Sequence, residues 1–316
     1  MRRVALIYNP ASGQYSARRA AAVQNAVTVF RNAGVAAELL VTNAAGGATE
    51  QAQRAVSEGY DTILACGGDG TVHEILQSLV GTEIALGVIP LGTANALAVD
   101  LGLAAPPVKA ARTLLAALPS RVPVGRIHYQ DETGQMRARY FLVAAGVGAD
   151  ALLMSRLDKG LKRRFGYVVY LVEALRIWAT DTFPFFEAAF TVNGSHTERI
   201  AEVSQLLAVR VRSFGGVLRE LAPGATLHNG TLRLLAFRTR SRFRYLKFLL
   251  AAVAGRQTFN GAIELVDTRH VECHRRDGSS ETVFVEADGE VLGTLPVRIE
   301  VVPQALTLLI PPHAEP

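Results

Sequence analysis

The clearest structural signal in the sequence lies in residues 62–71, Thr-Ile-Leu-Ala-Cys-Gly-Gly-Asp-Gly-Thr. Thr62–Cys66 is a short apolar run of the kind that forms a buried strand. The glycines of Gly67–Gly70 allow the backbone to turn tightly and to approach a ligand closely, and a helical pattern begins near Thr71. A helix that starts there directs backbone N–H groups and the positive end of its dipole at the turn. The stretch therefore predicts a phosphate-binding turn, with an ordinary turn capped by Asp69 as the alternative.

The same order of strand, loop and helix recurs along the first 118 residues. Strands are predicted at Val4–Tyr8, Glu38–Val41 and Ala85–Ile89, and helices at about 16–33, at 49–57 and after Asn95. Helices of this length between strands predict an open, largely parallel α/β sheet. Ligands of such sheets bind beyond the carboxyl ends of the strands. Three of the four strands end in loops rich in Gly, Ser, Thr and Asn, which favours a phosphate site over ordinary turn chemistry.

The second half of the chain is rich in β-strand patterns. Strands are predicted at about 122–129, 138–145, 185–192, 202–211, 231–238, 263–273, 281–287 and 296–302, with helices at 166–180 and 242–254. Asn193-Gly194 and Asp277-Gly278 are turn signals of the kind that join hairpin strands. The pattern predicts an all-β, sandwich-like second domain with inserted helices. We place the domains at 1–130 and 131–316 and expect a ligand site in a cleft between them.

The bulk composition is that of a globular protein with a large core. Of 316 residues 49% are hydrophobic and 19% are charged, which favours two domains and argues against disorder. Cys66 and Cys273 predict neither a disulfide framework nor a zinc cluster. The first apolar run is too short for a secretory signal, and no run approaches the roughly 20 apolar residues that cross a bilayer, so we expect a cytoplasmic protein.

The net charge of +5 suits an anionic partner, either a nucleotide or an acidic membrane face. Nucleic acid is not expected, because the basic residues are dispersed and only 7% of residues are aromatic. The stretch Arg240–Leu250 is both basic and apolar. It predicts either an interfacial helix on anionic lipid or a helix packed on the sandwich whose Arg and Lys side chains extend to water. Peripheral contact with an anionic membrane is therefore expected, and a homodimer is left open.

Several segments together resemble the catalytic superfamily of diacylglycerol, sphingosine and ceramide kinases, in its soluble bacterial form. The three nucleotide-site motifs are Asn9–Gly13, Gly67–Glu74 and Pro90–Ala98, and the resemblance continues through Gly146–Asp150, Phe214–Gly216, Ala222-Pro223 and Glu286–Glu290. It covers nearly the whole chain. The Gly-Gly-Asp-Gly-Thr motif is shared with NAD kinases and, loosely, with phosphofructokinases. The third motif and Asp288-Gly289-Glu290 separate this family from those two.

The resemblance implies an ATP-dependent lipid kinase with an NAD-kinase-like nucleotide-binding domain. The nucleotide site would comprise Asn9, Pro10, Ala11, Ser12, Gly13, Thr42, Gly67, Gly68, Asp69, Gly70, Thr71, Val72, His73, Thr93 and Asn95. Asp69 would help to hold the Mg²⁺ that accompanies ATP. Asp288, assisted by Glu290, would accept the proton of a hydroxyl on a diacylglycerol- or sphingoid-like lipid at the membrane surface. By the residues alone, a solvated hairpin turn is the more common interpretation of Asp288-Gly289.

Two positions depart from the family pattern. Many diacylglycerol kinases of the family carry Asp after the Asn of the third motif, where this chain has Ala96, similar to sphingosine kinases. This difference puts diacylglycerol itself in doubt as the substrate. Soluble bacterial members hold a structural Mg²⁺ with an Asp-Gly pair of the second domain, where this chain has Asn229-Gly230. A neutral Asn is a weaker ligand for Mg²⁺ than a carboxylate, so Asn229 predicts a weak structural metal site or none.

Three alternatives stay open. A kinase of a soluble nucleotide, as in NAD kinases, would share the Gly-Gly-Asp-Gly-Thr motif. A non-catalytic nucleotide or lipid sensor of the same fold is favoured by Ala96 and Asn229. His270, Glu272 and His274 would share one face of a strand and could bind a metal, although a solvent-facing His and Glu pair is the more common arrangement.

Overall fold

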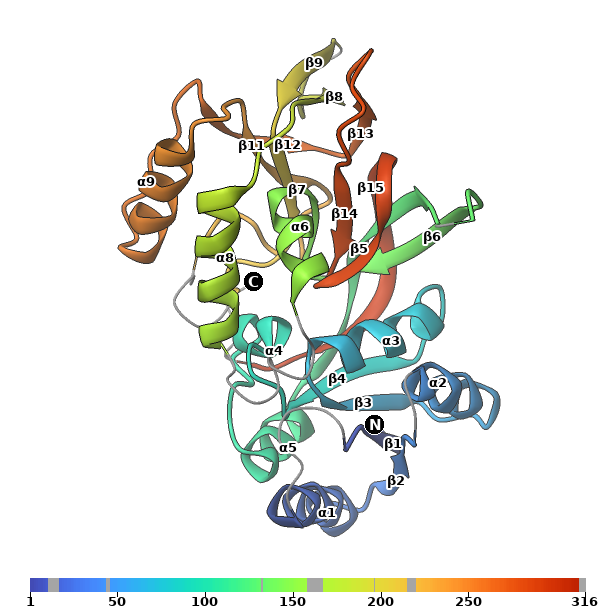
Figure 1. Ribbon diagram of the computed structural model, residues 1–316. Coiled ribbons are helices and arrows are strands. Elements are labelled where there is room, and N and C mark those ends of the chain that lie inside the picture. Colours follow the sequence, from blue (N-terminus) through green and yellow to red (C-terminus); the bar gives the residue numbers. More distant parts are fainter. Residues whose placement is uncertain are drawn as a thin grey trace. The chain divides into compact units, whose positions relative to one another are not determined.

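The computed structural model describes residues 1–10, 17–43, 46–131, 133–157, 167–195, 197–214 and 220–312. The chain forms two compact units (Figure 1). Unit 1 comprises Met1–Val124 together with Pro303–Pro316, and unit 2 comprises Gly125–Val302. The end of the chain thus belongs with its beginning. A division into the consecutive domains 1–130 and 131–316 assigns this last segment to the second domain. The segment belongs to unit 1 because its strand joins the sheet formed by the first strands of the chain.

Unit 1 contains the parallel α/β sheet that the sequence predicts. Its strands follow the order β4-β3-β1-β2, and every described pair among them is parallel. The strands are β1 (Arg3–Tyr8), β2 (Ala36–Val41), β3 (Thr62–Gly67) and β4 (Ala85–Pro90), and the helices are α1 (Ala17–Asn32), α2 (Gly47–Ser57), α3 (Asp69–Leu79), α4 (Ala96–Asp100) and α5 (Pro107–Leu115). Helix α1 packs beside α5, and α2 packs beside α3 (Figure 1). Since helices cover both faces of the sheet, β3 and β4 are buried along their whole length.

The C-terminal strand completes unit 1. Strand β15 (Glu290–Ile310) ends beside β4, where Thr307 and Leu308 pair in parallel with Ala85 and Leu86. Leu306 and Leu308 are fully buried there. The edge of the early sheet is therefore covered by the last strand of the chain.

Unit 2 is built from antiparallel strands with three described helices. Its main sheet follows the order β12-β11-β10-β7-β14-β15, and β13, β8 and β9 form a further row of pairs. The strands are β5 (Leu118–Gln130), which begins in unit 1, β6 (Met136–Phe141), β7 (Ala144–Gly148), β8 (Phe186–Thr191), β9 (Glu198–Val203), β10 (Gln205–Val209), β11 (Leu232–Phe237), β12 (Ile263–Thr268), β13 (His270–Arg275) and β14 (Phe284–Ala287), and the helices are α6 (Ala149–Arg156), α8 (Tyr167–Thr180) and α9 (Arg242–Val253). No helix in the described part of the chain is long and apolar enough to span a membrane.

Strand β10 shows how unit 2 is layered. Alternate residues of a strand point to opposite faces of the sheet. Leu206 and Ala208 pack in one core with residues of β8 and β13, whereas Leu207 and Val209 pack in a second core with Phe248 of α9. Both faces of this strand are therefore covered, one by other strands and one by helices. The sandwich-like expectation with inserted helices is confirmed.

Three strands predicted as continuous are each divided in two. The predicted strand at 202–211 is interrupted at Ser204, whose hydroxyl donates to the carbonyl of Thr239, and that at 263–273 is interrupted between β12 and β13. The predicted strand at 138–145 is interrupted at Leu142 and Val143, whose N–H groups bind a side chain instead of a neighbouring strand. The Asp277-Gly278 signal does form a turn. However, β13 pairs with β8 and β15, and β14 pairs with β7 and β15, so the turn does not join a hairpin.

Candidate active site

The polar loops of unit 1 meet at one edge because the strands are parallel. Tyr8 pairs with both Val41 and Cys66, and Gly67 pairs with Pro90, so the four strands end at neighbouring positions. The residues that follow them are Asn9, Thr42, Gly68 and Leu91. The carboxyl edge of such a sheet is where ligands bind. The structure thus brings the predicted loops of the nucleotide site together.

Hydrogen bonds join these loops to one another. Asn9 Nδ2 donates to Thr71 Oγ1 at 3.4 Å. Asp69 Oδ1 accepts a hydrogen bond from the N–H of Ala96 at 2.8 Å, which ties the start of α3 to the start of α4. The N–H of Leu91 donates to the carbonyl of Gly67 at 2.8 Å. Asn9 and the second and third motifs are therefore connected to one another by hydrogen bonds.

Glycine is required where the second and third loops touch. A Cβ atom on Gly92 would lie 2.7 Å from Gly68 Cα, and one on Gly67 would lie 2.3 Å from Thr71 Oγ1. Neither distance is tolerated between real atoms, and the first collision is with backbone that cannot move aside. The two glycine-bearing loops can approach this closely only without side chains.

The third loop is shaped by Asn95. Its backbone lies in the left-handed region at φ 50°, which Asn tolerates better than most residues. Its side chain accepts a hydrogen bond from the N–H of Gly92 at 2.9 Å and donates to the carbonyl of Gly92 at 2.8 Å. Asn95 thus fixes the loop, while Thr93 at its tip is exposed. Ala96 is buried and carries no ligand group, so its contribution is the N–H that Asp69 accepts.

Thr42 provides an observation that points to a ligand. Its side chain is buried at the end of β2, and within the described residues its hydroxyl has no hydrogen-bond partner. A buried hydroxyl without a partner is costly, so such groups usually bind something. A phosphate or ribose oxygen at this edge would satisfy the hydroxyl. The chemistry of the edge therefore fits a nucleotide.

Other residues of the second motif support the fold. Glu74 accepts hydrogen bonds from the N–H groups of Gly46 and Ala48, so its carboxylate caps the start of α2. The side chains of Val72 and His73, both predicted to contribute to the nucleotide site, are buried in the interior of unit 1. Their assignment to the nucleotide site stays a prediction. Three predicted site residues, Ala11, Ser12 and Gly13, lie outside the described residues.

Asp288 of unit 2 is held by three backbone N–H groups. Its Oδ2 accepts from Leu142 at 3.0 Å, and its Oδ1 accepts from Val143 at 2.8 Å and from Ala144 at 3.1 Å. Asp288 and Gly289 both have positive φ, as in a two-residue hairpin turn of type I′. The turn alternative was thus right about the backbone. The carboxylate, however, is not simply solvated, because the interruption between β6 and β7 fixes its position.

A second carboxyl pair lies beside Asp288. Glu286 and Gly146 are opposite each other on β14 and β7, and Asp150 lies in the first turn of α6. An atom placed at the Cβ position of Gly146 would lie 2.7 Å from Asp150 Oδ2 and 2.8 Å from Glu286 Oε1. Burial raises the pKa of both carboxyl groups, and the charge of Asp150 raises the pKa of Glu286 further. The two groups therefore retain a shared proton at a pH where isolated carboxyls are ionised.

The loop around Asn229, for which the sequence predicts a weak structural metal site or none, contains a guanidinium. Arg210 is fully buried. Its Nη2 donates to the carbonyls of Leu227 at 3.0 Å and Asn229 at 3.5 Å, and its Nη1 donates to the carbonyl of Thr231 at 3.5 Å. Asn229 Nδ2 donates to the carbonyl of Gly224 at 3.3 Å. These carbonyl oxygens face a cation that belongs to the chain. The residues around Asn229 do not fit a Mg²⁺ ion.

Arg210 also connects this loop to Asp288. Burial lowers the pKa of Arg210 to about 10, while the Asp288 carboxylate favours the charged form of the guanidinium. The backbone N–H of Arg210 donates to the carbonyl of Val143, next to the N–H groups that hold Asp288. The buried guanidinium of Arg210 and the half-buried carboxylate of Asp288 therefore compensate each other's charge.

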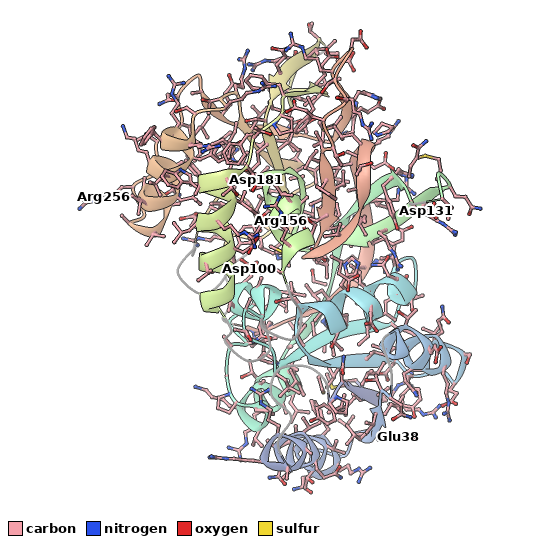
Figure 2. All side chains as sticks on the ribbon, in the orientation of Figure 1. Glu38, Asp100, Asp131, Arg156, Asp181 and Arg256 are labelled. Carbon is pink, nitrogen blue, oxygen red and sulfur yellow. The ribbon has the colours of Figure 1, made fainter. Side chains whose placement is uncertain are left out.

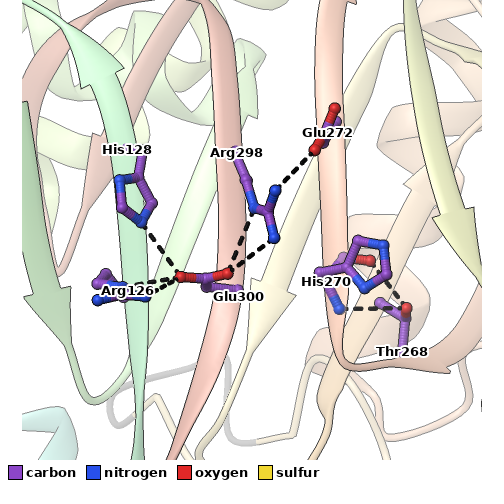
Figure 3. Close-up of polar contacts among 7 residues, drawn as sticks. All are labelled: Arg126, His128, Thr268, His270, Glu272, Arg298 and Glu300. Atoms are coloured by element: carbon purple, nitrogen blue, oxygen red, sulfur yellow. Dashed lines mark hydrogen bonds and ion pairs between the residues drawn. The ribbon is translucent and has the colours of Figure 1, made fainter. Parts of the chain in front are cut away.

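The cluster of His270, Glu272 and His274 does not form a metal site. Figure 3 shows Glu272 directed at Arg298, which donates to it at 3.2 Å, while Arg298 also contacts Glu300. Glu300 in turn accepts hydrogen bonds from Arg126 and is 3.2 Å from His128. Among the described residues no group of three His, Cys, Asp and Glu side chains lies close enough to hold a metal. The surface is a network of ion pairs.

A polar cavity of about 560 Å³ opens elsewhere in unit 2. Arg156 and Asp181 line it and lie together in Figure 2, where the two terminal nitrogens of the guanidinium donate to the carboxylate at 2.6 Å. Arg176, also on the wall, lies 3.8 Å from Glu173. Because both arginines already contact carboxylates, the cavity is a weaker candidate for phosphate than the strand edge of unit 1.

Three functional candidates escaped the sequence reasoning. Asp150 and Glu286 stand inside segments that carry the family resemblance, but they received no role. Glu286 could have been noticed as an acidic residue inside an apolar strand, Phe284–Ala287. Arg210 follows the apolar run of β10 in the same way. A charged residue within or directly after a buried apolar strand needs a partner, so both positions predict a buried polar interaction.

The fold and the loops define a class, an α/β unit with glycine-rich loops at its strand ends joined to a β-rich unit. Two family models match the chain. The diacylglycerol kinase catalytic domain matches residues 3–127, and the YegS C-terminal NAD kinase beta sandwich-like domain matches residues 142–310. The chain therefore belongs to the family of diacylglycerol kinases and YegS-like lipid kinases.

Individual relatives agree with this assignment. The diacylglycerol kinase of Mycobacterium tuberculosis is 30% identical over 98% of this chain and 96% of that protein. The diacylglycerol kinase of Bacillus subtilis is 27% identical over 94% and 92%. A crystal structure of a diacylglycerol kinase from Bacillus anthracis superposes with a TM-score of 0.71 at 22% identity, covering 99% of this chain and 98% of that one. At this identity the structural likeness shows the fold alone.

Proposed function

We propose that the protein is an ATP-dependent lipid kinase that phosphorylates a hydroxyl group of a diacylglycerol- or sphingoid-like lipid at a membrane surface. Family membership supports phosphoryl transfer to a lipid. The observation that carries the proposal is the joined set of loops at the strand ends of unit 1, with the buried hydroxyl of Thr42 among them. The backbone N–H groups and hydroxyls at this edge suit the phosphates of a nucleoside triphosphate.

The residues of unit 1 bind and orient the nucleotide. Helix α3 begins at Asp69, and among the described residues no side chain caps its first turn. The backbone N–H groups of this turn and the helix dipole therefore favour the binding of phosphate. Asn9, Thr42 and Thr93 add polar groups at the same edge. Asp69 offers one carboxylate, which suits Mg²⁺ because this ion is held by one or two carboxylates together with substrate phosphates. Bound Mg²⁺ would neutralise charge on the transferred phosphoryl group.

Asp288 of unit 2 acts as the general base. The lipid hydroxyl oxygen forms a bond to the γ-phosphorus, the bond from that phosphorus to the β–γ bridging oxygen breaks, and ADP leaves. The hydroxyl proton passes to the Asp288 carboxylate. Three backbone N–H groups hold the carboxylate in a fixed position, which orients it toward the hydroxyl it deprotonates. Glu290, two residues further along the turn, is the second acidic residue of this element.

The test is incubation with γ-labelled ATP, Mg²⁺ and a panel of diacylglycerol, sphingosine, ceramide, phosphatidylglycerol and NAD. We expect one lipid of the panel to be labelled. Asp288→Asn should lower kcat about 10²- to 10⁴-fold, the range typical of a lost general base. Asp277→Asn is the matched control, because Asp277 precedes Gly278 in an exposed turn of the same unit. Thermal unfolding of both variants separates loss of chemistry from loss of fold.

The same experiment discriminates the alternatives. Labelled NAD without labelled lipid would replace the proposal with a kinase of a soluble substrate. Nucleotide binding without any labelled product would indicate a sensor. Full activity of a folded Asp288→Asn protein would remove Asp288 from the mechanism, while leaving the lipid kinase assignment in place.

A further inference from the structure

Helix α9 has three distinct faces. Tyr245, Phe248 and Ala252 are buried against unit 2, where Phe248 contacts the ring of Phe237 edge to face. These residues are spaced by three and four positions, so they form one stripe along the helix. The packed-helix alternative is confirmed for this face. The other two faces of α9 are not part of this buried stripe.

A second face of α9 is apolar and exposed. Phe243 is 76% exposed, Leu250 63%, Val253 53% and Leu249 40%. At 100° per residue, Phe243, Leu250 and Val253 fall within a single sector of the helix, adjacent to Leu249. Single exposed apolar side chains are ordinary, but a stripe of four on one helix marks an interaction surface. We call these four residues the α9 apolar face.

A basic edge borders the α9 apolar face. Arg244 and Lys247 lie on the side of Phe243 that is turned away from Leu249, and both are exposed. The helix itself, Arg242–Val253, contains no acidic residue. An apolar stripe beside a basic edge is the composition of helices that lie in the plane of an anionic bilayer.

A contact with α8 holds the helix in place. Trp178 Nε1 donates to the carbonyl of Arg242 at 2.9 Å, and its ring meets Phe243 edge to face with centroids 6.3 Å apart. Arg242 donates to the carbonyls of Ala179 and Asp181 at 2.7 Å. The first turn of α9 is thus fixed to the end of α8. The exposed face is presented by a rigid element rather than by a loop.

We propose that α9 is the membrane-docking element of this protein, with the α9 apolar face inserted among the acyl chains of an anionic bilayer and Arg244 and Lys247 against its phosphate groups. The charge of the edge argues for an anionic lipid surface, and the aliphatic side chains argue for a bilayer rather than nucleic acid. The inference rests on the proposed function only in that the bilayer contains the lipid substrate. Docking itself requires neither ATP nor Asp288.

The experiment measures binding of the full chain to vesicles by flotation. Vesicles of phosphatidylcholine alone are compared with vesicles that also contain phosphatidylglycerol. We expect the native chain to bind the anionic vesicles. The pair Phe243→Ser and Leu250→Ser, and separately the pair Arg244→Glu and Lys247→Glu, should each weaken binding about tenfold or more. The charge pair should lose its effect at high salt, whereas the apolar pair should not.

Matched controls use exposed residues elsewhere in unit 2. Ile200→Ser removes an apolar side chain that is 66% exposed on β9, and Arg139→Glu reverses an exposed charge on β6. Both should bind vesicles as the native chain does. Equal losses in the control and α9 variants would overturn the proposal. So would a change of the α9 variants from dimer to monomer in light scattering, because the face would then join two copies.

The docking proposal and the proposed function fail in different ways. Kinase activity toward a short-chain lipid in detergent micelles should be unchanged in the α9 variants, while activity toward the same headgroup in vesicles should fall with binding. A native chain that binds anionic vesicles but labels no lipid would retain the docking role and remove the kinase. A chain that labels micellar lipid but binds no vesicles would do the reverse.

Discussion

Arg210 places one buried positive charge at the loop around Asn229. Its guanidinium contacts the carbonyl of Leu227 and lies near the carbonyls of Asn229 and Thr231, and the Asp288 carboxylate favours its charged form. Because this positive charge is covalently attached, we predict that the stability of the loop does not depend on metal concentration.

Substitution of Arg210 tests this role. Arg210→Met should lower the free energy of unfolding by about 3–5 kcal/mol, because it leaves buried carbonyls and a nearby carboxylate without their cation. Arg210→Lys should lose less, since it keeps the charge but not the planar donors. Arg139→Met, at an exposed position, should change it by less than about 0.5 kcal/mol. The measurement is urea unfolding.

Metal removal gives an independent check on the same residue. The unfolding midpoint of the native chain without nucleotide should be the same in EDTA and in excess Mg²⁺. A midpoint that falls in EDTA and recovers with Mg²⁺ would mean that the loop around Asn229 binds a metal in spite of Arg210.

The pairing of β7 with β14 brings two distant motifs together. Gly146 opposite Glu286 leaves room for the carboxyl groups of Glu286 and Asp150, which a larger residue would fill. The N–H of Gly289 donates to Glu286 at 2.7 Å, so the pair also supports the turn that carries Asp288. A shared proton removes one negative charge from this group of acids. The proton keeps the pair compatible with a third carboxylate nearby.

The pH dependence of stability follows from the raised pKa values of this pair. In the folded state both pKa values exceed the ordinary carboxyl value of about 4, so between that value and the raised ones the folded chain binds more protons than the unfolded chain. The stability that the protonated pair contributes is therefore full below about pH 4 and is lost as the pH rises through the folded pKa values.

Glu286→Gln should reduce this loss, because an amide does not ionise. The stability of the variant relative to the native chain, measured as the difference in their free energies of unfolding, should increase from pH 5 to pH 8. Urea unfolding across this range measures it. Glu198→Gln, at an exposed position of β9, is the control and should show a constant difference. A constant difference for Glu286→Gln as well would mean that the pair does not retain its proton.

The strand-end loops of unit 1 were predictable because their signals are local. A strand is read from its apolar run and a turn from its glycines, and parallel pairing then places Asn9, Thr42 and Gly68 at one edge. The role of Glu74 was not predictable, because its partners at Gly46 and Ala48 lie on another helix. The interruption at Leu142 and Val143 was missed for the same reason. Its cause is a carboxylate 145 residues away along the chain from Val143.

The composition of the units also escaped pattern reading. Whether residues after Pro303 join the first or the second unit depends on which sheet edge is free, and that edge, β4, lies more than 200 residues earlier. Unit 1 is accordingly closed by both ends of the chain. Its nucleotide loops depend on the last strand for the stability of the sheet that presents them.

Removal of the part of β15 that belongs to unit 1 should unfold this unit. A chain that ends at Val302 lacks Leu306, Leu308 and Leu309, which are all buried. Each buried leucine contributes about 2–5 kcal/mol, so the sum approaches or exceeds the 5–15 kcal/mol by which domains are typically stable. Hydrogen exchange should show the amides of β1 and β3 unprotected, while those of β10 and β11 stay protected. In the full chain, Leu308→Ala should cost about 2–5 kcal/mol and Val291→Ala, at an exposed position of the same strand, less than about 0.5 kcal/mol. Protection of β1 and β3 in the shortened chain would show that unit 1 folds without its C-terminal strand.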